Sequence, residues 1–462
     1  MRNEEREARD EGPSSGESPA FCVHRSGATG PDAVGVDALS ASAAGNTPDD
    51  SCVPPRLSPL APRSSQLPRS VFFASALCLA CLGVIAVQTA SVTSRQAGFE
   101  PIYLSRHLVN LGLAVAAMAW AGGRPRDFWR RAAWPAAGCV LLALVLVRVP
   151  GLGLSAGGAT RWLRTPGFTV QPSEWAKLSL PLLAAWWLTR CGSRRASLAA
   201  AATAAATLGL VLRQPDLGTT VLLVAAVGAT LWLGGWRLRD FAVVGLLAVP
   251  AAAAVSLRGY QMRRVEGLIA TWRDWRDAPY QLKQSLIALA EGGPWGVGLG
   301  QGWQKLSFLP ESHTDFVLAV VGEELGLLGI AVVAGFWAAL LISGLRMAEA
   351  TTDRFAAAVA GALVTMLALQ AGLNAAVVSA LIPPTGIPHP MLSYGGNSLL
   401  VTGLSLGMVL SLTRGAVTGE EEPSSAPVFD CLVEVADDRG QHLAAPNRGG
   451  TEIAEHARGA GL

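Results

Sequence analysis

Charged residues are scarce in this chain of 462 residues, at 15% of the total, whereas soluble globular proteins contain about 25%. Hydrophobic residues make up 51% of the sequence, and its mean hydropathy is +0.37. This composition predicts a membrane protein. Tyrosine is rare as well, with four residues, and 28 prolines are present. Both counts argue against an all-β or fibrous protein.

Cysteine and lysine offer few candidates for chemistry. The seven cysteines follow no disulfide or metal-site spacing. Cys78 and Cys81 form a CxxC pattern, but it lies inside an apolar run, which favours packing over redox chemistry. Of the 36 basic residues, three are lysines, at positions 177, 283 and 305, and the others are arginines. Each lysine is therefore a candidate functional residue.

Charge divides the chain into three parts. Residues 1–69 carry a net charge of −3 and residues 415–462 one of −6, which leaves +11 for 70–414. The two end segments are rich in Ser, Pro and Gly and are predicted to be disordered tails. The positive charge of 70–414 fits either an anionic partner, such as lipid headgroups or a phosphate-bearing substrate, or membrane topology alone.

Within 70–414 the apolar runs predict an all-α, polytopic membrane domain. Since a membrane-spanning helix needs about twenty mostly apolar residues, we place ten spans, near 71–90, 104–121, 132–149, 172–189, 196–212, 217–235, 241–257, 317–345, 355–380 and 393–413. Ten spans put both tails on one side. Arginine is more frequent in the loops of that side, which predicts cytoplasmic termini. Residues 258–316 then form a large extracytoplasmic loop.

Charged residues inside the spans are candidates for function, because charge in a membrane is costly. Glu174 and Lys177 lie three residues apart and share a helix face, so they form either a structural ion pair or a contact with substrate. Glu323 and Glu324 interrupt another span. Consecutive helical residues point about 100° apart, so these two cannot face the same partner, and one is expected to face a polar interior.

The segment 305–316, KLSFLPESHTDF, gathers several titratable residues at the start of the eighth span. Asp315 could be a helix-capping acid. Beside His313 and Lys305, its carboxylate could instead act as a general base for a substrate anchored in the bilayer. Glu311, His313 and Asp315 also offer metal-ligating groups, but one histidine and two acids without i, i+4 spacing do not form a recognised metal-site pattern.

Three glycine- or proline-rich stretches carry no catalytic pattern of their own. GVGLGQG (296–302) has no βαβ context, and SYGG (393–396) lacks the G-x-S-x-G elbow. PPTGIPHP (383–390) cannot form a regular helix. Irregular backbone in a membrane protein is tolerated where it lines a cavity or is buried in protein. These stretches therefore predict a cavity between helices that opens to the outer face.

Longer motifs resemble a known family. They are GATRWL (158–163), QPSEWAKL (171–178), QPDLGT (214–219), YQLKQSLIALAEGGPWGVGLGQGWQKL (280–306), FLPESHTDFVLAVVGEELGLLG (308–329) and PPTGIPHPMLSYGGNSLL (383–400). In this order they resemble the SEDS family (shape, elongation, division and sporulation proteins, with FtsW, RodA and SpoVE branches) over about 71–414. The pattern departs from the family at His389 and Met391, which affects local packing. QKL (304–306) and VGEELG (321–326) are more similar to the FtsW branch.

The resemblance implies a ten-helix glycosyltransferase of the bacterial inner membrane, which polymerises lipid II into β-1,4 glycan strands in cell division or elongation. Its essential acid corresponds to Asp315, and its conserved charged positions to Arg106, Arg161, Glu174, Lys177 and Asp216. Lys283 and His313 complete the expected substrate-binding set. The implied partners are lipid II, the nascent glycan, a class B penicillin-binding transpeptidase and divisome or elongasome proteins. No nucleic acid is expected.

The reaction that the resemblance implies converts an α-linked donor into a β-linked product, and for this inversion Asp315 is the candidate base for the acceptor hydroxyl. Arg106, Arg161 and Lys177 are candidates for a clamp on the departing pyrophosphate. No dedicated cofactor or metal site is expected, although Mg²⁺ or Mn²⁺ could accompany the pyrophosphate. Two other functions stay open: a lipid II flippase, which would use the same intramembrane charges and cavity, and a scaffold for the transpeptidase.

Overall fold

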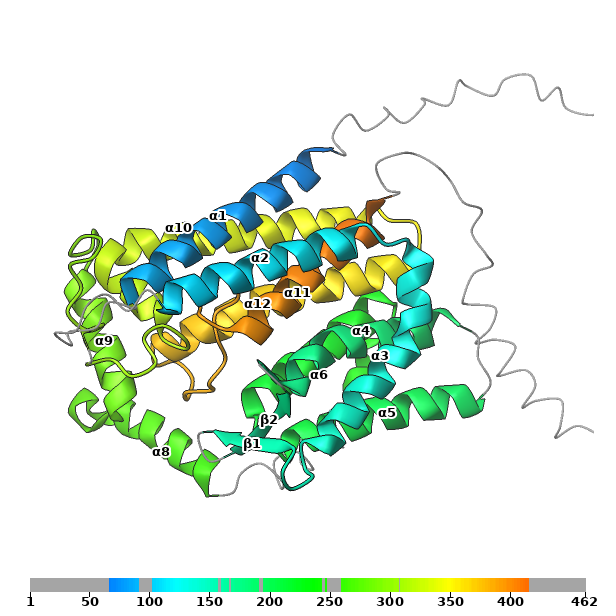
Figure 1. The fold of residues 1–462 in the computed structure, drawn as a ribbon, viewed down its shortest axis with the longest axis horizontal. Helices are drawn as coiled ribbons and strands as arrows, with labels where there is room; N and C mark the ends of the chain where they lie inside the picture. Colours follow the sequence, from blue (N-terminus) through cyan, green and yellow to red (C-terminus); the bar gives the residue numbers. More distant parts are fainter. Residues whose placement is uncertain are drawn as a thin grey trace, which may run out of the picture. The chain divides into compact units, whose positions relative to one another are not determined.

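The computed structural model describes residues 66–90, 102–156, 159–165, 168–190, 194–242, 246, 259–306 and 308–414, which all belong to the unit Pro62–Leu462 (Figure 1). The predictions for 1–65 and 415–462 fall outside these residues. Residues 66–69, assigned above to the N-terminal tail, instead begin the first helix.

Nine of the ten expected spans coincide with helices in the described part of the chain: α1 (Gln66–Ala90), α2 (Ile102–Gly122), α3 (Arg126–Leu146), α4 (Pro172–Thr189), α5 (Arg194–Leu212), α6 (Leu217–Leu233), α10 (Val317–Glu349), α11 (Arg354–Val378) and α12 (Gly396–Leu412). Among the described helices, α1, α3, α5, α10 and α11 are long and apolar enough to cross a membrane, and α6 and α12 are shorter apolar helices. The protein is therefore a helical membrane protein. The span 241–257 lies almost wholly outside the described residues, so the count of ten stays a prediction.

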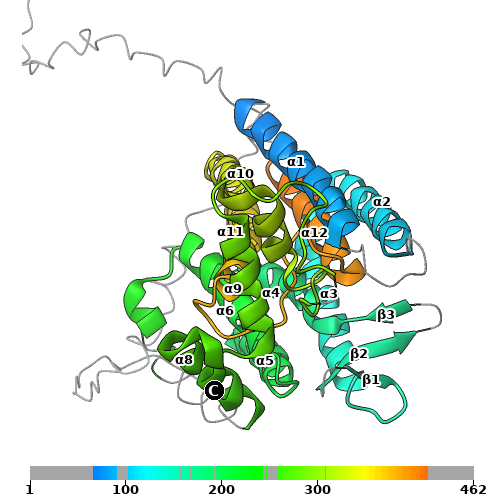
Figure 2. The same ribbon diagram turned by 90° about the vertical axis from the view of Figure 1, so that its left-hand side faces the viewer.

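Two segments contain structure that the apolar runs did not predict. The expected loop 258–316 forms α8 (Tyr260–Arg273), the short 3₁₀ helix η1 (Trp275–Asp277) and α9 (Tyr280–Gly292). Ahead of α4, the strands β1 (Gly153–Ala156), β2 (Ala159–Thr165) and β3 (Phe168–Val170) form an antiparallel sheet in the order β1-β2-β3 (Figure 2). A search for twenty-residue apolar runs detects neither amphipathic helices nor short strands.

Helix α11 lies at the centre of the helical packing. It contacts α10, α6, α12 and α4. Of its most apolar window, 67% is buried, against 17% for α5. Two polar residues of α11, Gln370 and Asn374, are enclosed by protein and are each 1% exposed.

Helices α2 and α12 are packed closely enough to require glycine. A Cβ added to Gly403 would lie 2.3 Å from the Ala114 carbonyl oxygen, and one added to Gly407 would lie 2.3 Å from that of Met118. Glycines four residues apart let two helix backbones approach closely, as is common in membranes. This contact fixes the start of α2 beside the segment that enters α12.

Helix α10 is broken at Gly326, whose φ of 66° is left-handed. The chain after α9 supplies hydrogen bonds around the break: Val297 and Gly298 donate to the carbonyls of Glu323 and Glu324, while Leu327 donates to Gly293. A broken helix in a membrane protein needs such replacement partners. The first turns of α10 are thus fixed to the segment after α9.

Candidate active site

Asp315 lies two residues before α10, in a turn whose backbone is held from three directions. The carbonyl of Asp315 accepts a hydrogen bond from Asn374 Nδ2 at 2.7 Å, and that of Thr314 accepts one from Ser393 Oγ at 2.5 Å. The carbonyl of His313 accepts one from the Tyr394 N–H at 2.8 Å. Three consecutive carbonyls are therefore anchored to α11 and to the segment that enters α12.

The Asp315 carboxylate lies against backbone. A Cβ added to Gly386 would be 3.7 Å from Asp315 Oδ2, and Gly386 has a φ of +73°, which favours glycine. Asn374 Nδ2 also donates to the Ile387 carbonyl at 3.0 Å. The stretch 383–390 thus adjoins the acid, and one amide group holds both.

The charges around Asp315 suit a general base. Its pKa is raised from 3.8 to about 6, mainly by burial, next by the Glu311 carboxylate and least by Asp216. Arg264 and Arg161 act in the opposite direction. A base is most effective when its pKa lies near the working pH. Asp315 combines this property with two nearby cations.

Arg161 on β2 closes onto the turn before α6. Its Nε donates to the Gln214 carbonyl at 3.0 Å, its Nη2 donates to the Pro215 carbonyl at 2.7 Å, and its Nη1 lies 4.0 Å from Asp216 Oδ1. Asp216 is buried and caps α6 by accepting from the Thr219 N–H at 3.2 Å. The structure therefore brings two of the expected charged residues together near Asp315.

Arg264 on α8 completes the cationic side of the site. Its Nη1 donates to the Pro384 carbonyl at 2.5 Å, which ties α8 to the stretch that adjoins Asp315. Sequence reasoning did not select Arg264, since nothing in the sequence separates it from its neighbour Arg263. Their exposure differs: Arg263 is exposed, and Arg264 is half-buried.

Glu174 and Lys177 form a buried ion pair on α4. Lys177 Nζ lies 2.7 Å from Glu174 Oε1 and donates to Gln370 Oε1 at 2.9 Å. Gln370 Nε2 in turn donates to the Pro388 carbonyl at 2.9 Å. Of the two interpretations left open above, this geometry favours the structural ion pair, which braces 383–390 against α4 and α11.

Two other residues expected to bind substrate, Arg106 and Lys283, have no contact with Arg161 or Arg264 among the contacts of the described residues. Arg106 is exposed on α2 and is not among the charges that shift the pKa of Asp315. Lys283 on α9 donates to the Arg276 carbonyl at 3.2 Å and lies 5.4 Å from the Trp275 ring centroid. In this structure Lys283 connects α9 to η1.

His313 belongs to a group of aromatic rings beside Asp315. Its ring centroid lies 4.9 Å from that of Tyr103 and 5.8 Å from that of Tyr394. Burial lowers the pKa of His313, and Glu311 opposes that shift. A neutral imidazole has one donor and one acceptor nitrogen.

The adjacent glutamates of α10 are both buried and have different partners, as their angular separation requires. Glu323 Oε1 accepts from the backbone N–H groups of Trp303 and Gln304, at 2.5 and 3.1 Å. Glu324 pairs with the buried Lys305 at 2.5 Å. Lys305 therefore fixes the chain before the Asp315 turn and is not part of the cationic side of the site.

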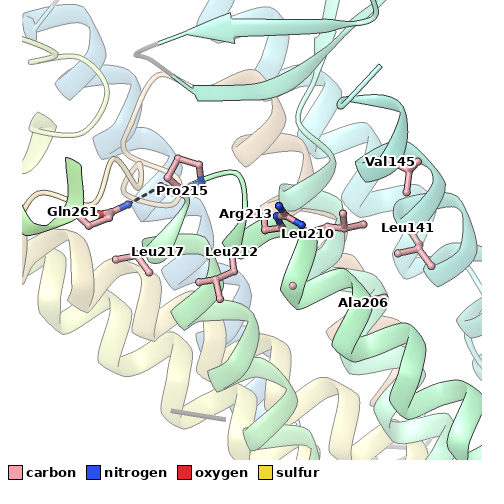
Figure 3. A pocket seen from close by; sticks show the side chains of 10 residues that line it. Leu141, Val145, Ala206, Leu210, Leu212, Arg213, Pro215, Leu217 and Gln261 are labelled. Carbon is pink, nitrogen blue, oxygen red and sulfur yellow. Dashed lines mark hydrogen bonds between the residues drawn. The ribbon is translucent and has the colours of Figure 1, made fainter. Parts of the chain in front are cut away.

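A cavity of about 870 Å³ lies between α3, α5 and α6 (Figure 3). Its lining is mostly apolar, and its polar members are Arg213 and Gln261. Pro215 also lines it, and the carbonyl of Pro215 accepts hydrogen bonds from both Arg161 and Gln261. Its described lining comes from α3, α5, α6, the turn between α5 and α6, and Gln261 of α8. None of it comes from the glycine- and proline-rich stretches, so the cavity expected from those stretches stays a prediction.

Residues 69–417 match the model of a protein family described as "Cell cycle protein", which covers FtsW, RodA and SpoVE proteins. The chain belongs to this family. A "Probable peptidoglycan glycosyltransferase FtsW" of Marinobacter nauticus is 39% identical over 357 residues, which cover 74% of this chain and 88% of the relative. "Stage V sporulation protein E" of Bacillus subtilis is 32% identical over 348 residues, 73% of this chain and 94% of the relative.

Solved structures give the same assignment. One, described as "Structural coordination of polymerization and crosslinking by a peptidoglycan synthase complex", aligns with a TM-score of 0.60 and 28% identity over 75% of this chain and 97% of its own. The rod shape determining protein RodA of Thermus thermophilus aligns with a TM-score of 0.56 and 26% identity over 75% of this chain and 96% of its own. The SEDS resemblance is confirmed. Relatives named FtsW confirm the leaning toward that branch.

Two polar residues inside an apolar span of this FtsW-like protein belong to the site, although sequence reasoning did not select them. Gln370 and Asn374 are polar residues four apart within an apolar span, so they share a helix face. That face meets 383–390 and the Asp315 turn. Among the described residues, no three His, Cys, Asp or Glu side chains are grouped to hold a metal ion.

Proposed function

We propose that this peptidoglycan glycosyltransferase of the FtsW type polymerises lipid II into β-1,4 glycan strands and releases undecaprenyl pyrophosphate. Family membership and the names of the relatives support the activity. The observation that carries the mechanism is the carboxylate of Asp315, which has a pKa of about 6 and is flanked by Arg161 and Arg264.

In this mechanism the acceptor 4-hydroxyl oxygen attacks the anomeric carbon of the lipid-linked donor sugar. The hydroxyl proton passes to Asp315, while the bond from the anomeric carbon to the pyrophosphate oxygen breaks and its electron pair leaves with the pyrophosphate. One displacement inverts the α-linked donor to a β-linked product. Fixed cations stabilise the charge that develops on the leaving group.

Arg264 and Arg161 are the best-placed cations for that task. Hydrogen bonds to the Pro384, Gln214 and Pro215 carbonyls hold their guanidinium groups, so little reorganisation is needed during the reaction. Arg106, Lys283 and His313 lie farther along the substrate path in this proposal. Lys177, enclosed with Glu174, acts by bracing the site. A divalent cation would accompany the pyrophosphate as part of the substrate.

The cavity between α3, α5 and α6 suits the polyprenyl chain of the donor. Its apolar lining matches a hydrocarbon tail, and its polar end at Pro215 and Gln261 adjoins the turn held by Arg161. A lipid lying there would present its pyrophosphate toward the cations. Arg213, exposed beside the cavity, adds a charge at the same end.

The orientation and partners follow the same proposal. Both termini face the cytoplasm, and the start of α10 faces the outer side of the bacterial inner membrane. A class B penicillin-binding transpeptidase would crosslink the glycan product, and division proteins would be further partners. This agrees with the similarity of this chain to a chain of a solved peptidoglycan synthase complex.

The test uses purified full-length protein and purified lipid II, with glycan length measured on gels. Asp315→Asn should reduce polymerisation by about a hundredfold or more, because the base is lost. Asp277→Asn, which changes an exposed acid on η1, should leave polymerisation unchanged. A liposome assay of lipid II translocation should show no transport. Transport without polymer formation would show that the protein is a flippase and not a glycosyltransferase. Polymerisation at the wild-type rate by Asp315→Asn would show that Asp315 is not the base.

A further inference from the structure

Four ring residues meet beside the Asp315 turn. The chain has four tyrosines, and two of them, Tyr103 and Tyr394, are here with His313 and His107. Tyr103 and His107 come from the start of α2, His313 precedes α10, and Tyr394 precedes α12. The close contact of α2 with α12 keeps these segments together.

The rings form an angled surface instead of a stacked core. Tyr103 and Tyr394 are T-shaped, with centroids 5.5 Å apart and planes at 85°. His313 is tilted by 47° and 57° to these two rings. All three side chains are half-buried, so part of each ring remains accessible. Within the described residues, no hydrogen bond is formed by either phenol hydroxyl.

Beneath these three rings lies the buried, polar side chain of His107. Its side chain is 0% exposed, its ring lies 6.4 Å from that of Tyr394, and neither ring nitrogen has a hydrogen-bond partner among the described residues. Buried polar atoms normally have partners, and those that do not call for an explanation. A ligand with hydroxyl groups, or water that it carries in, would provide partners.

The rings and the cations near Asp315 come from different elements. The arginines come from β2 and α8, whereas the rings come from α2 and the segments entering α10 and α12. The Tyr394 N–H donates to His313, two residues before Asp315, so the rings and the base share one anchored turn. Glu311, exposed beside His313, contributes a carboxylate acceptor at the rim.

We propose that Tyr103, His313 and Tyr394 form the subsite for the acceptor sugar of the glycan. A pyranose presents C–H groups on its faces, which pack on the electron-rich face of an aromatic ring, and hydroxyl groups at its edge, which need polar partners. Half-buried rings with a few polar groups are typical of sites for such amphipathic ligands. This assignment rests on the proposed glycosyltransferase, because it names where that reaction's second substrate lies.

Binding of a soluble acceptor tests the subsite apart from the reaction. The probe is a lipid-free tetrasaccharide of alternating N-acetylglucosamine and N-acetylmuramic acid, titrated into the full-length protein in detergent and followed by saturation-transfer NMR. Tyr103→Ala and Tyr394→Ala should each weaken binding about tenfold, the amount expected for one aromatic contact. Tyr103→Phe keeps the ring and should bind within about threefold of wild type. Phe73→Ala, which removes an exposed ring of α1, should have no effect.

Kinetics and stability separate binding from folding. Tyr103→Ala should raise the KM for acceptor while kcat and the thermal unfolding midpoint stay near wild type. Unchanged tetrasaccharide binding by both alanine variants would overturn the subsite, as would a wild type that polymerises lipid II without binding the probe. Neither result contradicts the proposed glycosyltransferase activity. That activity is contradicted only if the wild-type protein makes no glycan from lipid II.

Discussion

The side-chain amide of Asn374 donates to the Asp315 carbonyl at 2.7 Å and to the Ile387 carbonyl at 3.0 Å. One buried residue near the C-terminal end of α11 therefore fixes the distance between the acid and the irregular stretch that adjoins it. Asn374 Oδ1 has no hydrogen-bond partner among the described residues. The contribution of this side chain to the site is therefore made by its NH₂ group, which donates both hydrogen bonds.

Asn374→Ala should lower kcat by about ten- to a hundredfold, because a small displacement of a reacting group is costly. Two buried carbonyls would lose a donor, so the protein should also be less stable by about 1–3 kcal/mol. Single-turnover polymerisation and thermal unfolding measure the two effects. Asn110→Ala, which changes a half-buried amide on α2, is the control. Wild-type kcat in Asn374→Ala would show that the turn holds its shape without this amide.

The polymerisation rate should depend on the ionisation of Asp315. A base must be unprotonated, and this pKa is about 6, so the rate should rise with pH up to about pH 7 and then level off. Asp315→Asn should show no such rise in its residual rate. Initial rates of lipid II consumption across pH 5–8 measure the profile. A wild-type rate that stays level across this range would mean that the carboxylate has its ordinary pKa and is solvated, not buried.

The same pKa predicts how Asp315 affects stability. The folded-state value is raised above the ordinary 3.8, so the carboxyl holds its proton more tightly when folded, and its ionisation costs stability as pH rises from about 4 to 6. Above that range the cost is constant. Asp315→Asn should then be more stable than wild type by about 3 kcal/mol at pH 8, with a difference that shrinks toward pH 4. Thermal unfolding at both pH values measures it, and equal stability at pH 8 would contradict the burial of this charge.

The helical layout was readable from the sequence, because membrane helices are long apolar runs. The span predicted at 172–189 matches α4 residue for residue. Asp315 was selected because it belongs to a cluster of titratable residues at the start of a span and because its motif resembles a known family. The partners of Asp315 were harder to find. Arg264 and Arg161 come from α8 and β2, elements whose short or amphipathic patterns do not stand out, and only the folded chain brings them to one acid.

The role of Lys177 shows the same limit. Its position in an apolar span indicated importance, but the sequence could not separate substrate contact from an ion pair. The deciding contact is with Gln370, 193 residues away. Contacts between distant segments depend on packing, which local patterns do not encode.

Removing one member of the Glu174–Lys177 pair should be more harmful than removing both. Lys177→Met leaves a buried carboxylate without its cation, which costs about 3–5 kcal/mol, whereas the double variant Glu174→Gln, Lys177→Met leaves no charge. The double variant should therefore recover much of the unfolding temperature and part of the activity. Full stability with no polymerisation in the double variant would instead support direct contact of Lys177 with the pyrophosphate.

Neighbouring arginines on α8 offer a matched pair for testing the pyrophosphate clamp. Arg264 donates to Pro384 and lowers the pKa of Asp315, while Arg263 is exposed. Arg264→Ala should reduce kcat by about ten- to a hundredfold, because a fixed cation at the leaving group is lost. It should also move the midpoint of the pH profile upward, since the cation that favours the ionised carboxylate is gone. Arg263→Ala should change neither quantity. A lower rate with an unshifted midpoint would mean that Arg264 acts through Pro384 alone, and equal effects of the two variants would assign the loss to the general charge of α8.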